Sequence, residues 1–343
     1  MTDLDPRPTV RLADPGALAA GLPHLLGFRP EESLVVVSLR GPEPLTVGLT
    51  ARVDLPPPGH RAALARDLAR SVGTDDPTAV ALVVVSEDDD GAELPHRGLL
   101  REAVLAFHDH RVPVRDALLV RRGRWWSYDC PRSCCAPGAG TPLPGGTSDL
   151  AVAAVVHGTV VEAGRAALPA RIAPVGSAGM DRACAEVGDE LAAATAERGW
   201  DAVAEQGWDA VLAAVHEAGT ARAARLSDRQ VARLAWGLRD ADLRDRALTL
   251  ALGESAPGAE VVWTELTRRA PAPLDAAPAT LLAVSAWLRG DGALANVALD
   301  RALGSEPGYT LAGLLRTALD ACLPPAVVRQ VIREAAGPSG AGR

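Results

Sequence analysis

The chain contains no lysine, so all 35 of its basic residues are arginine. Walker A loops and protein kinases require a lysine against the nucleotide phosphates. Pyridoxal phosphate enzymes and Schiff-base aldolases require a lysine as nucleophile. The missing lysine therefore excludes these classes, unless an arginine replaces it as a phosphate ligand. Asparagine occurs only at Asn296, and we attribute both biases to GC-rich codon usage.

Long apolar runs and targeting segments are also missing. No stretch approaches the roughly 18 apolar residues of a membrane-spanning helix, and the first residues lack the basic and then apolar pattern of a signal peptide. We therefore expect a cytoplasmic protein without a membrane partner, whose five cysteines are thiols or metal ligands and not disulfides. The motifs GxGxxG, GxSxG and HExxH do not occur, so the common dinucleotide-binding, serine hydrolase and metalloprotease classes have no support.

Acidic residues outnumber basic residues, so the formal net charge is −8 at pH 7. Binding to a nucleic-acid backbone requires a basic surface, so we expect no nucleic-acid partner. The length of 343 residues exceeds the usual size of one domain and predicts two domains, or one domain with an extension. Because 48% of the residues are apolar, the chain can bury a sizeable core.

The first half of the chain alternates short apolar runs with amphipathic segments. β-branched or alternating runs bounded by turn residues predict strands, and apolar residues at helical spacing predict helices. The expected strands are 33–39, 46–54, 79–85, 117–120 and 125–128, and the expected helices are 15–26, 60–72 and 96–110. This pattern predicts an α/β domain over residues 1–170, with a mostly buried sheet flanked by helices.

The second half has a different character, because the strand pattern disappears after residue 170. Helical spacing predicts an all-α region over residues 171–336, followed by a disordered tail at 337–343. The expected helices are 180–198, 200–217, 226–252, 258–269, 276–288, 292–304, 309–320 and 325–335. The spacing Ala295-xxx-Leu299-xx-Ala302-xxxx-Pro307 resembles the second helix and exit of a tetratricopeptide unit, so we expect stacked helix pairs that offer a surface to a partner protein.

Three separated motifs resemble those of one known family. They are Leu26-Gly27-Phe28-Arg29-Pro30-Glu31-Glu32-Ser33-Leu34-Val35, then Trp125-Trp126-Ser127-Tyr128-Asp129-Cys130 with Cys134-Cys135 and Pro137, and a helical run from Ala286 to Ala295 that continues to Tyr309. In these motifs the chain resembles the actinobacterial "domain of unknown function 4192" family over nearly its whole length. The chain departs from the family pattern at Ala136-Pro137-Gly138, where two prolines and an acid are expected. The resemblance implies a lineage and no particular activity.

The segment Cys130-Pro131-Arg132-Ser133-Cys134-Cys135 holds three of the five cysteines. Three interpretations are open: the sulfurs are buried packing groups, they bind a metal, or they include a reactive thiolate with a resolving partner. Zinc, the candidate metal, takes four ligands, so three cysteines need a fourth residue, for which the candidates are His108, His110 and His157. The predicted metal ligands are Cys130, Cys134, Cys135 and His108.

A second candidate site is expected where the first strand begins, in a turn of polar residues. The acidic loop 87–90 follows the most apolar strand, and open α/β sheets bind ligands at the carboxyl ends of their strands. The alternative is that the turn only caps the strand and that the charged loop is only solvated. The predicted ligand-binding residues are Arg29, Glu32, Ser33, Trp125 and Trp126.

These observations favour a cytoplasmic regulatory or scaffolding protein that senses a ligand or metal and contacts a partner through its helical part. The alternative is a thiol- or metal-dependent hydrolase or transferase centred on Cys130, Cys134 and Cys135, so whether the chain is an enzyme stays open at this point. A third interpretation is that the helical half is a structural lid that completes the core of the first domain.

Overall fold

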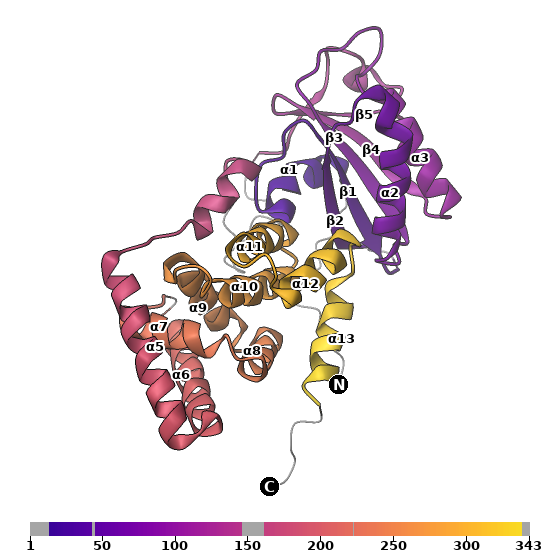
Figure 1. The fold of residues 1–343 in the computed structure, drawn as a ribbon. Helices are drawn as coiled ribbons and strands as arrows, with labels where there is room; N and C mark the ends of the chain where they lie inside the picture. The colour runs from indigo at the N-terminus through magenta and orange to yellow at the C-terminus, as the bar shows by residue number, and fades with distance from the viewer. Residues whose placement is uncertain (1–13, 43–44, 146–160, 222, 338–343) are drawn as a thin grey trace. The chain divides into compact units, whose positions relative to one another are not determined.

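The structure is a computed structural model, and it describes residues 14–42, 45–145, 161–221 and 223–337 (Figure 1). Contacts between residues divide this part of the chain into two units. The first comprises the described residues up to Ala166 together with Ala321–Pro324, and the second comprises those of Ala167–Asp320 and from Pro325 onwards. The expected disordered tail, 337–343, lies outside the described residues except for Gly337.

A six-stranded sheet forms the centre of the first unit, with the strand order β2-β1-β3-β4-β5-β6. Its strands are β1 (Ser33–Arg40), β2 (Thr46–Asp54), β3 (Ala79–Val85), β4 (Val114–Arg121), β5 (Arg124–Ser127) and β6 (Thr141–Pro142). The neighbours β3 and β4 are parallel, whereas the other neighbouring pairs are antiparallel. The unbroken apolar run of β3 is buried on both faces up to Val84, as a central strand requires.

Helices cover both faces of this sheet. They are α1 (Pro15–Leu26), α2 (Arg61–Gly73) and α3 (Arg97–Asp109). Figure 1 shows α2 and α3 on one side of the sheet and α1 on the other. The apolar sides of α2 and α3 form one buried cluster with alternate strand residues such as Val36, Leu82 and Leu119. The predicted α/β layer is confirmed, as a mixed sheet with helices.

The short strand β6 is absent from the sequence-based expectation, because two residues carry no periodic pattern. Its Thr141 and Pro142 pair with Trp125 and Arg124 of β5. The intervening segment, residues 128–140, carries the three neighbouring cysteines, so the β5–β6 pairing anchors both ends of that loop to the sheet.

The second unit consists of packed helices, as predicted for this half of the chain. They are α5 (Ala178–Arg198), α6 (Trp200–Ala221), α7 (Asp228–Gly237), α8 (Ala241–Leu248), α9 (Ala256–Arg269), α10 (Ala276–Arg289), α11 (Gly292–Ser305), α12 (Thr310–Asp320) and α13 (Pro325–Ala335). Residues 276–288 of α10 are all buried, because α10 is apolar on every side and packs against α9, α11 and α13.

The prediction of one continuous helix over 226–252 is wrong. The structure has α7, then α8, then the 3-10 turn Thr249–Leu252. The helix is interrupted at Asp240, because the backbone of this residue is extended. Its side chain accepts a hydrogen bond from the N–H of Leu243 and so caps the start of α8. The tetratricopeptide-like character of α11 stays a prediction. No helix among the described residues combines the length and the apolar character that crossing a bilayer requires.

Candidate functional site

The carboxyl end of β3 carries a network of polar side chains. Ser86 donates from Oγ to Glu32 Oε2 at 2.9 Å, and the N–H of Glu87 donates to the other oxygen of that carboxylate at 2.7 Å. His96 Nε2 lies 3.1 Å from Ser86 Oγ and 3.1 Å from Asp88 Oδ2. Glu32 (φ 36°) and His96 (φ 61°) both have left-handed backbone, which is rare for residues other than glycine. Contacts to Ser86 therefore hold two strained turns together.

This network contains a serine, a histidine and an aspartate, but its geometry is not that of a nucleophilic triad. In a triad the carboxylate binds the imidazole nitrogen opposite the one that faces the serine. Here Asp88 and Ser86 share Nε2 of His96, and Ser86 is only 1% exposed. The network fixes the loop after β3 and presents no nucleophile. Sequence reasoning singled out Glu32 but missed Ser86 and His96, since Glu32 and Ser86 are 54 residues apart and only the fold joins them.

Beside this network, Arg121 and Asp90 form a buried ion pair. The Arg121 Nη2 lies 2.8 Å from Asp90 Oδ2, and the two side chains are 7% and 9% exposed. The guanidinium also stacks over the Trp126 ring, 4.9 Å from its centroid. Burial alone raises the pKa of the Asp90 carboxyl, but hydrogen bonds from Arg121 and from the Gly138 N–H outweigh it, so the pKa lies below its ordinary value.

The three neighbouring cysteines converge in the loop between β5 and β6. The Sγ atoms of Cys130, Cys134 and Cys135 all lie within 4.8 Å of one another, and those of Cys134 and Cys135 are 3.9 Å apart. Cys134 and Cys135 both lie in the 3-10 turn Ser133–Cys135. Cys134 is exposed, Cys130 is half-buried, and Cys135 is buried where its sulfur accepts a hydrogen bond from the Ser127 N–H at 3.3 Å. Sequence spacing alone could not establish this convergence.

Two of the three thiols, those of Cys130 and Cys135, have pKa values shifted in opposite directions. A hydrogen bond from the Arg132 backbone, followed by one from the Cys135 thiol, lowers the pKa of Cys130. Burial raises the pKa of Cys135 to about 11. Cys130 therefore loses its proton more readily than Cys135, and a cation beside Cys135 would favour its thiolate.

The cysteine loop is attached to the polar edge of the sheet through backbone groups. The Gly138 N–H donates to Asp90 Oδ2 at 2.6 Å. Arg124 donates to the carbonyl oxygens of Ala139 and Gly140 at 3.2 and 2.7 Å. Gly140 lies so close to Trp126 that a Cβ there would fall 2.4 Å from the ring. The buried ion pair and the three sulfurs thus belong to one connected site.

The predicted ligand-binding residues do not form one pocket. The side chain of Arg29 is exposed and makes no hydrogen bond or ion pair with any described residue. Ser33 is fully buried in β1, and its hydroxyl has no hydrogen-bond partner within the described segments. Trp125 and Trp126 are consecutive in β5, so they face opposite sides of the sheet, the first against Gly16 and the second in the core below α2 and α3. A binding role for these residues stays a prediction.

His108, the predicted fourth metal ligand, is not part of the group formed by the three sulfurs. His108 lies exposed near the end of α3, and the group of converging ligand atoms contains only the three cysteines among the described residues. The Nδ1 of His110 lies 2.9 Å from the carbonyl oxygen of Ala106. His157 lies outside the described residues.

Comparison with known proteins gives a family and no activity. No curated protein and no solved structure matches the chain significantly. The model of the family described as "Domain of unknown function (DUF4192)" matches residues 15–326, which cover most of both units and the cysteine loop. The sheet edge, the three-sulfur loop and the helical unit described above are therefore features of a chain that belongs to this family.

Proposed function

We propose that this protein is a metal-sensing regulatory protein of the cytoplasm, in which Cys130, Cys134 and Cys135 hold the metal. The observation that supports this proposal is the convergence of three sulfur atoms within 4.8 Å in a chain whose spacing gave no zinc motif. Thiolates bind soft ions such as zinc and copper(I). With Zn–S bonds of about 2.3 Å, two sulfurs on one zinc ion lie about 3.8 Å apart, close to the 3.9 Å between Cys134 and Cys135.

The surroundings of the sulfurs favour metal binding over nucleophilic catalysis. A catalytic thiol needs a base within hydrogen-bond reach. No histidine or carboxylate joins the three sulfurs in the part of the chain that the structure describes. A cation would also stabilise the thiolate of Cys135, whose pKa is raised to about 11 by burial.

The attachment of the loop supplies a way to transmit metal binding. A bound ion fixes Cys130, Cys134 and Cys135 relative to one another. The same loop is hydrogen-bonded at Gly138 to the Arg121–Asp90 pair, so ordering the loop stabilises the acidic turn at the end of β3. In this proposal the helical unit contacts a partner protein, because stacked helices offer extended binding surfaces. The origin we propose is an actinobacterium, in keeping with the codon bias.

A second candidate function is a thiol- or metal-dependent hydrolase or transferase centred on the same three cysteines. The observation that favours it is the number of ligands. Three protein ligands leave one position of a tetrahedral zinc ion open, which is the pattern of catalytic sites, where the fourth position holds water or substrate. The exposure of Cys134 gives that position access from solvent.

The deciding experiment is the metal content of the purified, untagged protein, measured by mass spectrometry. We expect about one zinc, iron or copper ion per chain, and we expect the combined variant Cys130→Ser, Cys134→Ser, Cys135→Ser to lose it while keeping its circular dichroism spectrum. Cys322→Ser is the control, because Cys322 is a half-buried cysteine outside the loop. A parent protein without metal, even after reconstitution with zinc and copper(I), would contradict the proposal. Ester and phosphomonoester hydrolysis by the loaded parent, absent from the triple variant, would favour the second candidate.

A further inference from the structure

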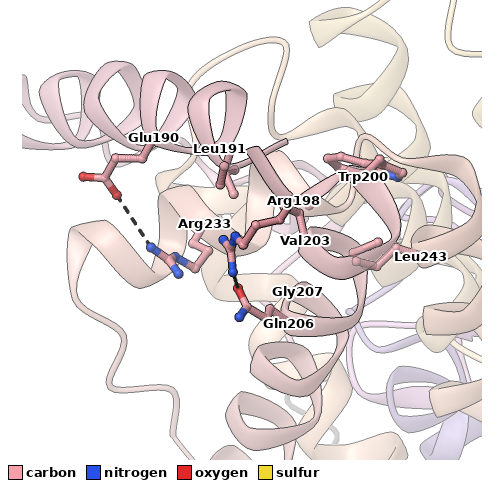
Figure 2. Close-up of a pocket in the computed structure, with 12 residues that line it drawn as sticks. Glu190, Leu191, Arg198, Trp200, Val203, Gln206, Gly207, Arg233 and Leu243 are labelled. Atoms are coloured by element: carbon pink, nitrogen blue, oxygen red, sulfur yellow. Dashed lines mark hydrogen bonds and ion pairs between the residues drawn. The ribbon is translucent and has the colours of Figure 1, made fainter. Parts of the chain in front are cut away.

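A pocket of about 220 Å³ lies in the helical unit, between α5, α6, α7 and α8 (Figure 2). Nothing in the sequence marks it, since its lining residues come from four helices. Apolar side chains form most of its wall, and two guanidinium groups stand among them. The lining includes Leu191, Val203, Leu243, Trp200, Arg198 and Arg233.

Small residues create the space. Gly207 of α6 and Gly237 of α7 both line the pocket. A Cβ on Gly207 would already lie 3.0 Å from the Leu243 Cδ1. The indole of Trp200 is fixed at the pocket by its Nε1–H, which donates to Asp240 Oδ2 at 2.9 Å.

The two arginines that line the pocket differ in their partners. Glu190 binds Arg229 through both oxygens at 2.8 Å and lies 3.6 Å from Arg233, and a second carboxylate, that of Glu186, lies 3.6 Å from Arg229. Arg198 donates only to the neutral amide oxygen of Gln206, at 3.2 Å, and meets no carboxylate among the described residues (Figure 2). Arg198, whose side chain is exposed, is therefore the lining arginine that has no carboxylate partner among the described residues.

We propose that this pocket binds a small monocarboxylate, with its apolar body against Leu191, Val203 and Leu243 and its carboxylate on Arg198. The volume of about 220 Å³ is below the roughly 300–1,000 Å³ of sites for drug-sized ligands, so the ligand is small. The lining is mostly apolar, which favours a hydrocarbon body over a sugar or nucleotide. One guanidinium without a carboxylate partner suits a single negative charge better than a doubly charged phosphate.

The test is calorimetric titration of the full chain with hexanoate, with phenylacetate and with the neutral hexanamide. We expect at least one carboxylate to bind and the amide to bind more weakly. Arg198→Gln should weaken carboxylate binding about tenfold or more, because a hydrogen bond from a charged group is lost. Arg182→Gln is the matched control, since Arg182 is an exposed arginine of the same helix that does not line the pocket, and it should leave the affinity unchanged. The two carboxylates distinguish an aliphatic from an aromatic ligand.

A second variant tests the pocket without changing its charge. Ala204→Leu adds a larger apolar side chain to the lining and should abolish binding, while the circular dichroism melt shows that the variant folds. Absence of binding by both carboxylates would overturn the proposal. So would equal binding of hexanamide, or an affinity that neither Arg198→Gln nor Ala204→Leu changes. The readout is independent of metal at the cysteine loop, so this proposal and the proposed function fail separately.

Discussion

Arg121 is a charged side chain inside the first unit, and a buried charge is tolerated only where partners replace the water that it has lost. Its partners are the Asp90 carboxylate, the Asp88 carbonyl oxygen and the face of Trp126. Asp90 in turn accepts the Gly138 N–H of the cysteine loop. One carboxylate thus satisfies a buried cation and also attaches the loop.

We expect Asp90→Asn to lower the free energy of unfolding by about 3 kcal/mol at neutral pH, because it leaves the Arg121 guanidinium buried without its counterion. Asp89→Asn is the control. The Asp89 side chain is 84% exposed, and its ion pair with Arg122 spans 3.4 Å at the surface, so this change should be nearly neutral. Urea unfolding of the two variants and the parent measures the difference, and equal costs would contradict a special role for Asp90.

Because the pKa of Asp90 is lowered in the folded protein, the stability that its carboxylate contributes should depend on pH. A carboxyl whose pKa is lower in the folded state stabilises the fold above its unfolded pKa, and that contribution is lost as the pH falls toward the folded value. The parent should therefore lose more stability than Asp90→Asn between about pH 5 and pH 2. Melting temperatures across this range check the sign, and parallel curves would contradict it.

At the scale of elements, the cysteine loop owes its path to β5, β6 and two glycines with positive φ. Gly138 (φ 77°) and Gly140 (φ 78°) have nearly the same backbone conformation but different surroundings. A Cβ on Gly138 would meet nothing within 4 Å, whereas a Cβ on Gly140 would fall 2.4 Å from the Trp126 ring. Alanine substitutions at the two positions can therefore distinguish the cost of backbone strain from the cost of a steric clash with Trp126.

We expect Gly138→Ala to cost about 1 kcal/mol of stability, through the left-handed backbone alone. Gly140→Ala should cost about 3 kcal/mol, because the new methyl group must also displace Trp126 or the loop. It should also reduce the metal content of the loop, as Cys134 accepts a backbone hydrogen bond from Gly140. Urea unfolding followed by tryptophan fluorescence, with metal analysis, tests both changes, and equal costs would show that Trp126 does not restrain the loop.

At the scale of the whole molecule, the first unit contains its own core. The buried cluster below α2 and α3 is made of residues between Leu34 and Cys135, and the bridge from Phe28 to Glu162 also lies within this unit. The helical unit has a separate core around α10. This division bears on whether the helical half is a lid or an independent part.

We expect a fragment of residues 1–166, which leaves out only Ala321–Pro324 of the first unit, to fold without the helical unit, because the apolar cluster is complete within that range. The measurement is the dispersion of its amide NMR spectrum, together with a cooperative thermal transition. A fragment of residues 167–343 serves as the reciprocal case. An unfolded 1–166 fragment would support the interpretation of the helices as a lid over the first unit.

The sequence by itself determined most of the elements. The continuous apolar run of β3 and the all-round apolar character of α10 each identify a buried element, because burial on several faces demands apolar residues in an unbroken run. The α/β part followed by a helical part could be predicted for the same reason. The same periodicity predicted one helix where the structure has α7 and α8, because apolar spacing does not reveal the N-cap at Asp240.

Only the tertiary structure decided how the polar groups meet. The pairing of Asp90 with Arg121, the network around Ser86 and the pocket beside Arg198 join residues from separate elements, whose positions depend on strand order and helix packing. The cysteines are close in sequence, yet their convergence depends on a 3-10 turn and on β6, which has no periodic pattern. Apolar patterning encodes burial along the chain, whereas hydrogen bonds and metal ligands depend on directions and distances that exist only after the chain has folded.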